Sequence, residues 1–202
     1  MSALQEERPP EKKHSGAAAA PSSEHRRGKA VRGVKYVAVT AVFTALLLGA
    51  QYALWYVKGV ELVTLLLLVF SYRFGVRCGV LSAVAFSLLR CFLFGFFPSV
   101  ILLYLIYYPL FALLFGLLGR AFSRRIGWRI VLVLTAAAVV CTVCFTLLDD
   151  VITPLFYGYT REAALAYFVA SLPTMAVQTV CAAVTVGLLA RPLLALLKRV
   201  KL

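Results

Sequence analysis

The chain has 202 residues, of which 62% are hydrophobic and only 14% are charged, and its formal net charge is +13 at pH 7. Apolar residues in such proportion, arranged in long uninterrupted runs, exclude an ordinary soluble domain and indicate an integral membrane protein. The runs show no alternation of apolar and polar residues, so the membrane segments are expected to be helices rather than barrel strands. In such a protein the basic residues record membrane orientation, and no nucleic-acid partner is expected.

Residues 1–33 differ from the rest of the chain. They are rich in Pro, Ser, Ala and charged residues and have no apolar periodicity, which predicts a disordered, basic cytoplasmic tail. Both histidines, His14 and His25, lie in this tail. We therefore expect no metal site and no histidine-based chemistry inside the membrane domain.

Residues 34–202 are predicted to form one all-α domain, a compact bundle of six transmembrane helices. Apolar runs between polar breaks place these helices at about residues 35–57, 60–72, 76–97, 99–119, 128–152 and 161–190. Pro98 is expected to close the third helix, Pro154 to lie beyond the fifth, and Thr160 to cap the sixth. The second run is shorter than the roughly 17 residues that a span usually needs. Its full crossing is the weakest part of this prediction.

The distribution of charge agrees with six crossings. If the tail is cytoplasmic, the internal loops carry the arginines at 73 and 77, the cluster at 120–129, and the basic residues at 191–201. The external side then keeps only Lys58 and Arg161 among exposed basic residues. All internal loops are basic and no external loop is, as the positive-inside rule requires. Both termini are therefore expected in the cytoplasm.

Two helices carry small residues at every fourth position. In the first helix these are Ala41, Ala45, Gly49 and Ala53; in the third they are Gly75, Gly79, Ala83, Ser87, Cys91 and Gly95. Close approach of helix backbones drives association in lipid, so each stripe is a packing surface. One stripe is expected to pack inside the bundle and one to remain for a different membrane protein. Spacing does not decide which.

Several features of the chain together resemble a known family. They are its length, its six-helix layout, its basic loops, the Ala41-Val-Phe-Thr-Ala45 element and the phrase "ELVTLLLLVFSYRFGVRCGVLSAVAFSLLRCFLFG". They are similar to the substrate-binding S components of energy-coupling factor (ECF) vitamin transporters, over about residues 35–190. The resemblance implies a multi-pass cell-membrane subunit that captures a vitamin-like small molecule on the external side. It also implies docking, through Ala41 and Ala45 with Gly49 as an extension, on a transmembrane coupling protein that carries two ATPase subunits.

Arg90 is the most informative polar residue within the apolar runs. A buried arginine in lipid must face protein or water, and Arg90 falls within the arc of the small-residue stripe of its helix. Two interpretations remain open at this stage. Arg90 either forms a structural ion pair with Asp149 or Asp150, or it binds a carboxylate or phosphate of the substrate.

The other candidate substrate-binding residues gather toward the predicted external side. Tyr104 and Tyr108, one turn apart, are candidates to stack on a flat ring, and Gln178 is expected to contact the ligand or another helix. Asp149 and Asp150 are either solvated at a helix end or turned into the cavity. Glu61 has the same two interpretations.

The sequence lacks the motifs of several enzyme classes. It has no GxxxxGK[ST] loop, no HExxH and no GxSxG, so we expect neither ATP hydrolysis by this chain nor the usual intramembrane protease or hydrolase chemistry. No cofactor is expected. The alternatives to a transport subunit are a membrane-embedded lipid-modifying enzyme, with Asp149 and Asp150 as acids, and a stand-alone facilitator.

Overall fold

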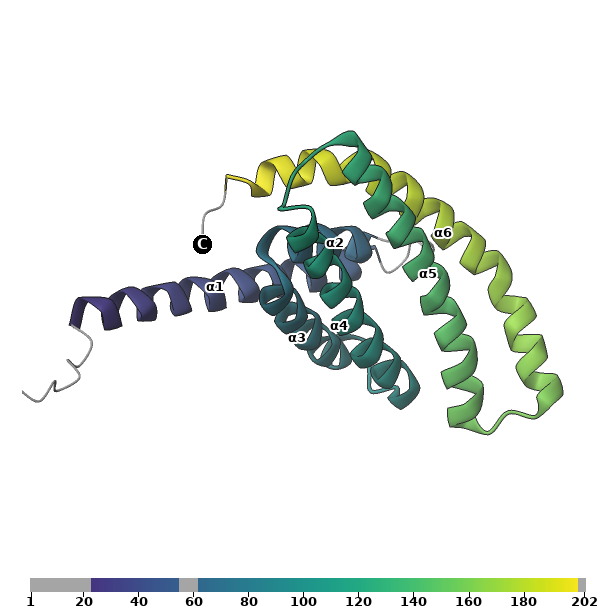
Figure 1. Ribbon diagram of the computed structural model, residues 1–202. Helices are drawn as coiled ribbons and strands as arrows, with labels where there is room; N and C mark the ends of the chain where they lie inside the picture. Colours follow the sequence, from purple (N-terminus) through teal and green to yellow (C-terminus); the bar gives the residue numbers. More distant parts are fainter. Residues whose placement is uncertain (1–22, 55–61, 200–202) are drawn as a thin grey trace, which may run out of the picture.

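The computed structural model describes residues 23–54 and 62–199. It contains six helices: α1 (Ser23–Ala53), α2 (Leu62–Phe74), α3 (Val76–Phe94), α4 (Pro98–Ala121), α5 (Trp128–Tyr157) and α6 (Arg161–Leu197). The described residues include no strand. Five helices are long and apolar enough to cross a membrane, α1 doing so over Gly33–Ala53. The expected all-α, multi-pass membrane bundle is thus confirmed, and Figure 1 shows the arrangement of its helices.

Several helix ends differ from the sequence-based limits. Helix α1 begins at Ser23, inside the segment expected to be a disordered tail, whose residues 1–22 lie outside the described part. Residues 23–33 contain no proline, and extending an existing helix costs much less than starting one. Pro98 does not close the third helix but begins α4, a position where its missing N–H removes no hydrogen bond.

Helix α5 continues through Pro154, which was expected to lie beyond it, and α6 continues through two prolines. Helix α5 passes Pro154 and ends at Gly158, whose left-handed backbone (φ 64°) lets its N–H bond back to the Pro154 carbonyl. Helix α6 contains Pro173 and Pro192 and arches over the bundle (Figure 1). Each proline removes only one backbone hydrogen bond, so a long packed helix bends rather than stops.

The short helix α2 forms the centre of the bundle. Its 13 residues span about 20 Å, less than the hydrocarbon core of a bilayer. Most of these residues are buried, because α1, α3, α4 and α6 all pack against this helix. The rings of Phe43 on α1 and Phe70 on α2 stack with centroids 3.9 Å apart. The short second run is therefore a central helix enclosed by protein.

Three glycines bring α2, α3 and α4 into close contact. A Cβ added at Gly116 would come within 2.8 Å of the backbone nitrogen of Val76, and one at Gly119 would overlap the carbonyl oxygen of Tyr72. A Cβ at Gly79 would overlap the side chain of Ser71. Helices approach each other this closely only where the side chain is a hydrogen atom.

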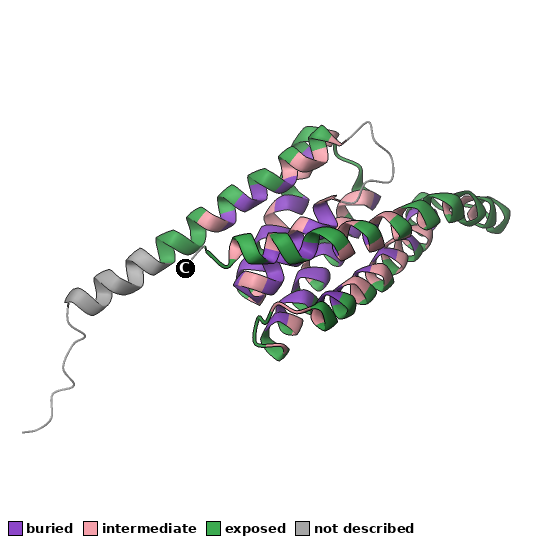
Figure 2. Ribbon diagram, turned by 90° about the horizontal axis from the view of Figure 1, so that it is seen from above, coloured by how far each residue is buried: buried purple, intermediate pink, exposed green. Residues whose placement is uncertain are grey.

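The α5–α6 hairpin forms a second layer, packed against α2 and α4. Figure 2 shows the buried residues concentrated among the central helices, whereas the turn between α5 and α6 is exposed. Thr160 precedes α6, and its side chain accepts a hydrogen bond from the N–H of Ala163 at 3.3 Å. The predicted N-cap is confirmed.

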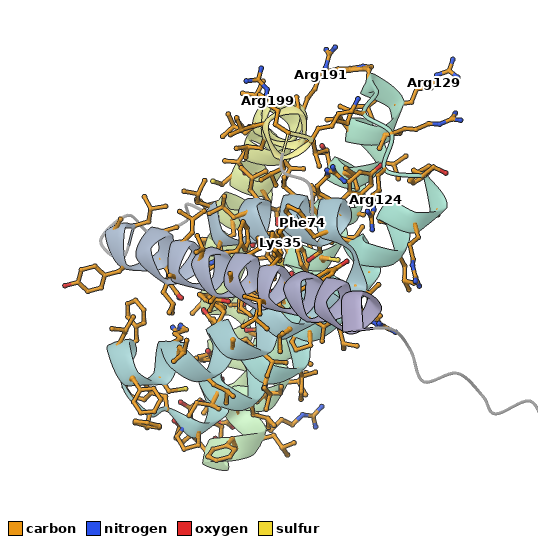
Figure 3. The ribbon with its side chains drawn as sticks, turned by 90° about the vertical axis from the view of Figure 1, so that its left-hand side faces the viewer. Lys35, Phe74, Arg124, Arg129, Arg191 and Arg199 are labelled. Atoms are coloured by element: carbon orange, nitrogen blue, oxygen red, sulfur yellow. The ribbon has the colours of Figure 1, made fainter. Side chains whose placement is uncertain are left out.

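Basic residues gather at one end of the bundle, which we call the basic end. The α2–α3 turn, the α4–α5 connection and the end of α6 meet there. The Tyr72 hydroxyl donates to the carbonyl of Arg125 at 2.8 Å, and Arg73 donates to the carbonyl of Lys198 at 3.4 Å. Arg129, Arg191 and Arg199 project from this end (Figure 3). The cytoplasmic position of this end, and of both termini, stays a prediction.

Candidate functional site

The small-residue stripe of α1 faces outward. Ala41, Ala45 and Gly49 are all exposed, and a Cβ added at Gly49 would have nothing within 4 Å. The opposite face of α1 is buried, with Phe43 and Leu47 in the core. Ala41 and Ala45 line a shallow groove of about 330 Å³ between α1 and α3.

The corresponding stripe of α3 faces inward. Gly79, Ala83, Ser87 and Cys91 are buried, and the hydroxyl of Ser87 donates to the carbonyl of Tyr104 on α4 at 3.1 Å. The stripe on α3 thus packs inside the bundle and the one on α1 is left free of the molecule's own helices. This distinction could not be made from spacing.

Arg90 contacts aromatic rings rather than acids. Its guanidinium carbon lies 4.2 Å from the centroid of the Tyr104 ring and 5.2 Å from that of Phe94, within the range of cation–π attraction. No ion pair joins it to Asp149 or Asp150, both of which the structure describes; their carboxylates bond to hydroxyls instead. The buried Nε of Arg90 has no hydrogen-bond partner among the described residues.

Tyr104 and Tyr108 belong to an aromatic cluster between α3, α4 and α5. Their ring centroids lie 4.9 Å apart, and Tyr104 packs edge-on against Phe145 of α5 at 5.8 Å. Phe86 of α3 packs edge-on against Tyr108 at 5.3 Å, and Tyr108 is only 5% exposed. Tyr108 is thus a core residue, whereas Tyr104 forms the boundary between this core and Arg90.

Asp149 and Asp150 bind two different places on α6. Asp149 accepts hydrogen bonds from the hydroxyls of Tyr167 and Thr153, both at 2.8 Å. Asp150 accepts one from Ser171 at 2.8 Å, and its second oxygen is buried with no partner among the described residues. The two acids therefore hold the α5–α6 hairpin together, as polar groups do between helices in lipid.

A cavity of about 260 Å³ lies between α5 and α6, next to Asp149. Its lining combines polar and apolar groups: Phe145, Thr146, Asp149, Tyr167, Ala170, Ser171, Thr174 and Gln178. Gln178 lies 3.5 Å from the hydroxyl of Thr146, which donates to its side-chain oxygen. Asp149 and Gln178, two of the predicted site residues, thus share one small polar cavity.

Phe145 connects the two groups of candidate residues. It lines the α5–α6 cavity and also packs against Tyr104 and Tyr107, at 5.8 and 4.7 Å between centroids. Arg90 packs on Tyr104, so Phe145 connects these residues to the cavity that Asp149 lines. Glu61, also proposed as a ligand contact, lies outside the described residues.

Sequence reasoning missed Phe145 and Ser171, although a signal was present. On α6, Tyr167, Ser171, Thr174 and Gln178 recur at intervals of three or four residues, and α5 has a matching polar face that includes Asp149. Hydroxyl and amide groups at helical spacing on otherwise apolar helices indicate a shared polar interface.

The described residues contain no group of three or more His, Cys, Asp or Glu side chains that could hold a metal ion. The site is therefore built from one arginine, aromatic rings, hydroxyls, an amide and two carboxyls. Comparison with models of protein families, with curated proteins and with solved structures finds no match for this chain.

Proposed function

We propose that this protein is the substrate-binding subunit of an ECF-type importer for a vitamin or similar small organic molecule. The observation that carries the proposal is the outward position of Ala41, Ala45 and Gly49 on a helix whose other face is buried. A bare stripe in lipid gains attraction only when another helix packs on it. The resemblance to ECF S components implies that this partner is a transmembrane coupling protein that carries two ATPase subunits. This chain has no ATP-binding loop of its own.

Substrate would bind in the half of the bundle away from the basic end. Asp149 and Gln178 offer hydrogen-bond acceptors in the α5–α6 cavity, and Gln178 also carries donors. Arg90 lies beyond Phe145 and has an unpartnered Nε among the described residues. The lining suits a small organic molecule with both polar and ring portions, and both anionic and cationic substrates remain compatible with it.

Transport follows from differential binding of the partner. The coupling protein must bind the ligand-loaded and empty forms of this subunit with different free energies, since otherwise ATP hydrolysis could not bias its orientation. The exposed stripe lies on α1, which also packs on the central helix α2 through Phe43 and Phe70. Docking therefore acts on the core of the bundle.

The test is co-purification from the native host in mild detergent, with identification of proteins and small molecules by mass spectrometry. Wild-type protein is expected to retain a coupling protein and two ATPases. Ala41→Trp and Ala45→Trp should each abolish that association, because a Trp side chain fills the groove. Ala136→Trp on α5 is the matched control, since Ala136 is also exposed. Assembly that survives both α1 substitutions contradicts the docking face.

The small molecule retained by the same preparations tests the binding site. Ala41→Trp and Ala45→Trp should leave its affinity unchanged, whereas Asp149→Asn and Arg90→Met should weaken it by tenfold or more, as loss of a buried charged contact does. If Asp149→Asn and Arg90→Met both bind the small molecule with wild-type affinity, these two residues have a structural role and do not bind substrate.

No observation favours the lipid-modifying enzyme. Asp149 lines the α5–α6 cavity, but Asp150 does not and bonds to Ser171 instead. The two carboxyls are thus directed to separate partners, whereas an acid–base pair must address one reacting group. The stand-alone facilitator is tested by the co-purification, since it predicts substrate without partners.

A further inference from the structure

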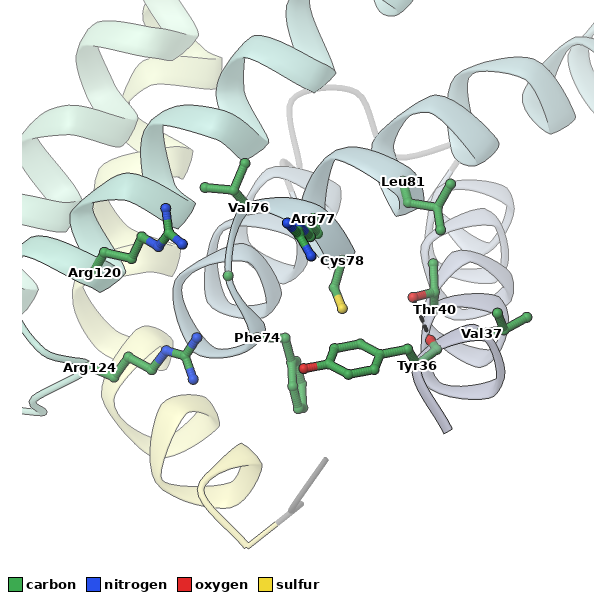
Figure 4. A pocket seen from close by; sticks show the side chains of 11 residues that line it. Tyr36, Val37, Thr40, Phe74, Val76, Arg77, Cys78, Leu81, Arg120 and Arg124 are labelled. Atoms are coloured by element: carbon green, nitrogen blue, oxygen red, sulfur yellow. Dashed lines mark hydrogen bonds between the residues drawn. The ribbon is translucent and has the colours of Figure 1, made fainter. Parts of the chain in front are cut away.

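A second cavity lies at the basic end, far from the residues assigned to substrate. It has a volume of about 680 Å³ and lies between α1, the start of α3 and the end of α4 (Figure 4). Its lining residues are Tyr36, Val37, Thr40, Phe74, Gly75, Val76, Arg77, Cys78, Leu81, Arg120 and Arg124. The proposed function leaves it without a role.

Three arginines give this cavity a strong positive charge. Arg77 belongs to α3, Arg120 to the last turn of α4, and Arg124 to the connection directly after α4, so two segments far apart in the sequence converge. No lining residue is acidic. Within residues 62–199 the only acids are Asp149, Asp150 and Glu162, on α5 and α6. The charge of these guanidinium groups is therefore not offset by a neighbouring carboxyl in the described part of the chain.

The backbone around Arg124 is held in an uncommon conformation. Ser123 and Arg124 both have positive φ, 48° and 53°, a region that side-chain-bearing residues seldom adopt. The N–H of Arg124 bonds to the carbonyl of Gly119 at 2.8 Å. A Cβ added at Gly75 would lie 3.1 Å from the guanidinium of Arg124, so a glycine there leaves room for it. This turn places the exposed side chain of Arg124 at the edge of the cavity (Figure 4).

The cavity continues into the apolar groove between α1 and α3. Val37, Thr40 and Leu81 line both. Beyond them the groove is lined by Ala41, Thr44, Ala45, Leu48, Ala85 and Leu89 and has almost no polar surface. A charged cavity at a helix end thus opens directly into an apolar channel along two membrane-spanning helices.

We propose that this composite site binds an anionic phospholipid, with its headgroup phosphate among Arg77, Arg120 and Arg124 and one acyl chain along the α1–α3 groove. Guanidinium groups bind phosphate through paired, directional hydrogen bonds, and basic pockets between transmembrane helices are typical sites for lipid headgroups. A free phosphate would satisfy the arginines but would leave the groove unfilled. The continuity of the two cavities favours the lipid.

This proposal does not depend on the importer function. Ala41 and Ala45 belong to both the groove and the docking stripe, so substitutions there would disturb either activity. Ala85 and the three arginines lie outside the stripe and are the residues to change. Ala85 borders the same groove as Ala41 and Ala45, so the three arginines are the positions at which a result bears on the lipid site alone.

The experiment measures lipid binding to the full chain in mild detergent by native mass spectrometry and by titration. The probes are phosphatidylglycerol, phosphatidylcholine with the same acyl chains, and inorganic phosphate. The triple variant Arg77→Gln, Arg120→Gln, Arg124→Gln is compared with the charge-matched Arg129→Gln, Arg191→Gln, Arg199→Gln, which changes basic residues outside the cavity. All six arginines are exposed, and size-exclusion elution at the wild-type volume verifies that each variant is folded.

We expect wild-type protein and the control triple variant to bind phosphatidylglycerol at least tenfold more tightly than phosphatidylcholine or inorganic phosphate. The cavity triple variant should lose this preference, and Ala85→Trp should weaken the lipid at least fivefold by filling the groove. Equal losses in the two triple variants would overturn the proposal, because they would indicate only a general surface charge. Inorganic phosphate binding as tightly as the lipid, unaffected by Ala85→Trp, would overturn it in favour of a free-phosphate site.

Discussion

Gly119 allows a sharp test of the close packing between α2 and α4. A Cβ at this position would overlap the carbonyl oxygen of Tyr72 and lie 3.0 Å from its carbonyl carbon, so the obstacle is backbone. Tyr72 is fully buried, and its hydroxyl bonds to the carbonyl of Arg125. It therefore cannot move aside at low cost. Overpacking of this kind costs about 1–3 kcal/mol of unfolding free energy.

The matched control is Gly49, another helical glycine, where an added Cβ meets nothing within 4 Å. Replacing glycine by alanine in a helix gains about 1 kcal/mol of intrinsic propensity at either position. That gain cancels in the comparison, and Gly119→Ala should be about 1–3 kcal/mol less stable than Gly49→Ala. At about 2–4 °C per kcal/mol for a domain of this size, the expected difference in Tm is roughly 2–12 °C.

Thermal unfolding of the two purified variants in the same mild detergent, followed by tryptophan fluorescence or size-exclusion, measures this difference. The Tm of the wild-type protein should lie between those of the two variants, or equal that of Gly119→Ala if the overpacking costs only about 1 kcal/mol. If Gly119→Ala melts at or above the temperature of Gly49→Ala, the described approach of α4 to Tyr72 is wrong.

Two further predictions concern the α5–α6 hairpin. Tyr167→Phe removes the hydroxyl that donates to Asp149 and should lower the free energy of unfolding by about 1–3 kcal/mol, because a partly buried acceptor loses its partner. The control Tyr159→Phe, at an exposed tyrosine, should have the Tm of the wild-type protein. Equal Tm values for the two variants and the wild type would contradict the contact between Tyr167 and Asp149. Thr160→Ala removes the N-cap of α6 and should lower the free energy of unfolding by about 0.5–2 kcal/mol, whereas Thr160→Ser should keep the wild-type value. A Thr160→Ser protein that melts as early as Thr160→Ala in the same experiment would argue against capping.

Sequence signals that act within a few residues, such as caps and the polar breaks between apolar runs, predicted several helix starts correctly. The predicted starts of α3 and α5, at residues 76 and 128, coincide with the observed ones, and the Thr160 cap is confirmed. The end of α5 was misplaced, since Pro154 was taken as a boundary. Its effect is limited to one missing hydrogen bond, and Gly158 four residues later closes the helix. The residue that ends a helix is thus decided by its cap and its packing as well as by its propensity.

The candidate site was predicted only in part. Asp149 and Gln178 do meet in one cavity, because their helices form a hairpin whose register follows from a short turn. The pairing of Arg90 with an acid could not be decided from the chain, and the structure places Arg90 on Tyr104 instead. Contacts between α3, α4 and α5 depend on how three separate helices pack, and no periodicity within one helix encodes that.

Hydropathy and charge along the chain were sufficient to predict a helical membrane protein with one basic end, because long apolar runs and the basic loops between them can be read from the order of the residues. Which small-residue stripe is buried, why a helix of 13 residues suffices at the centre, and which charged groups share a cavity were decided by packing in three dimensions. The stripes on α1 and α3 are chemically alike. Only the neighbours that α2 and α4 provide make one of them core and leave the other facing lipid.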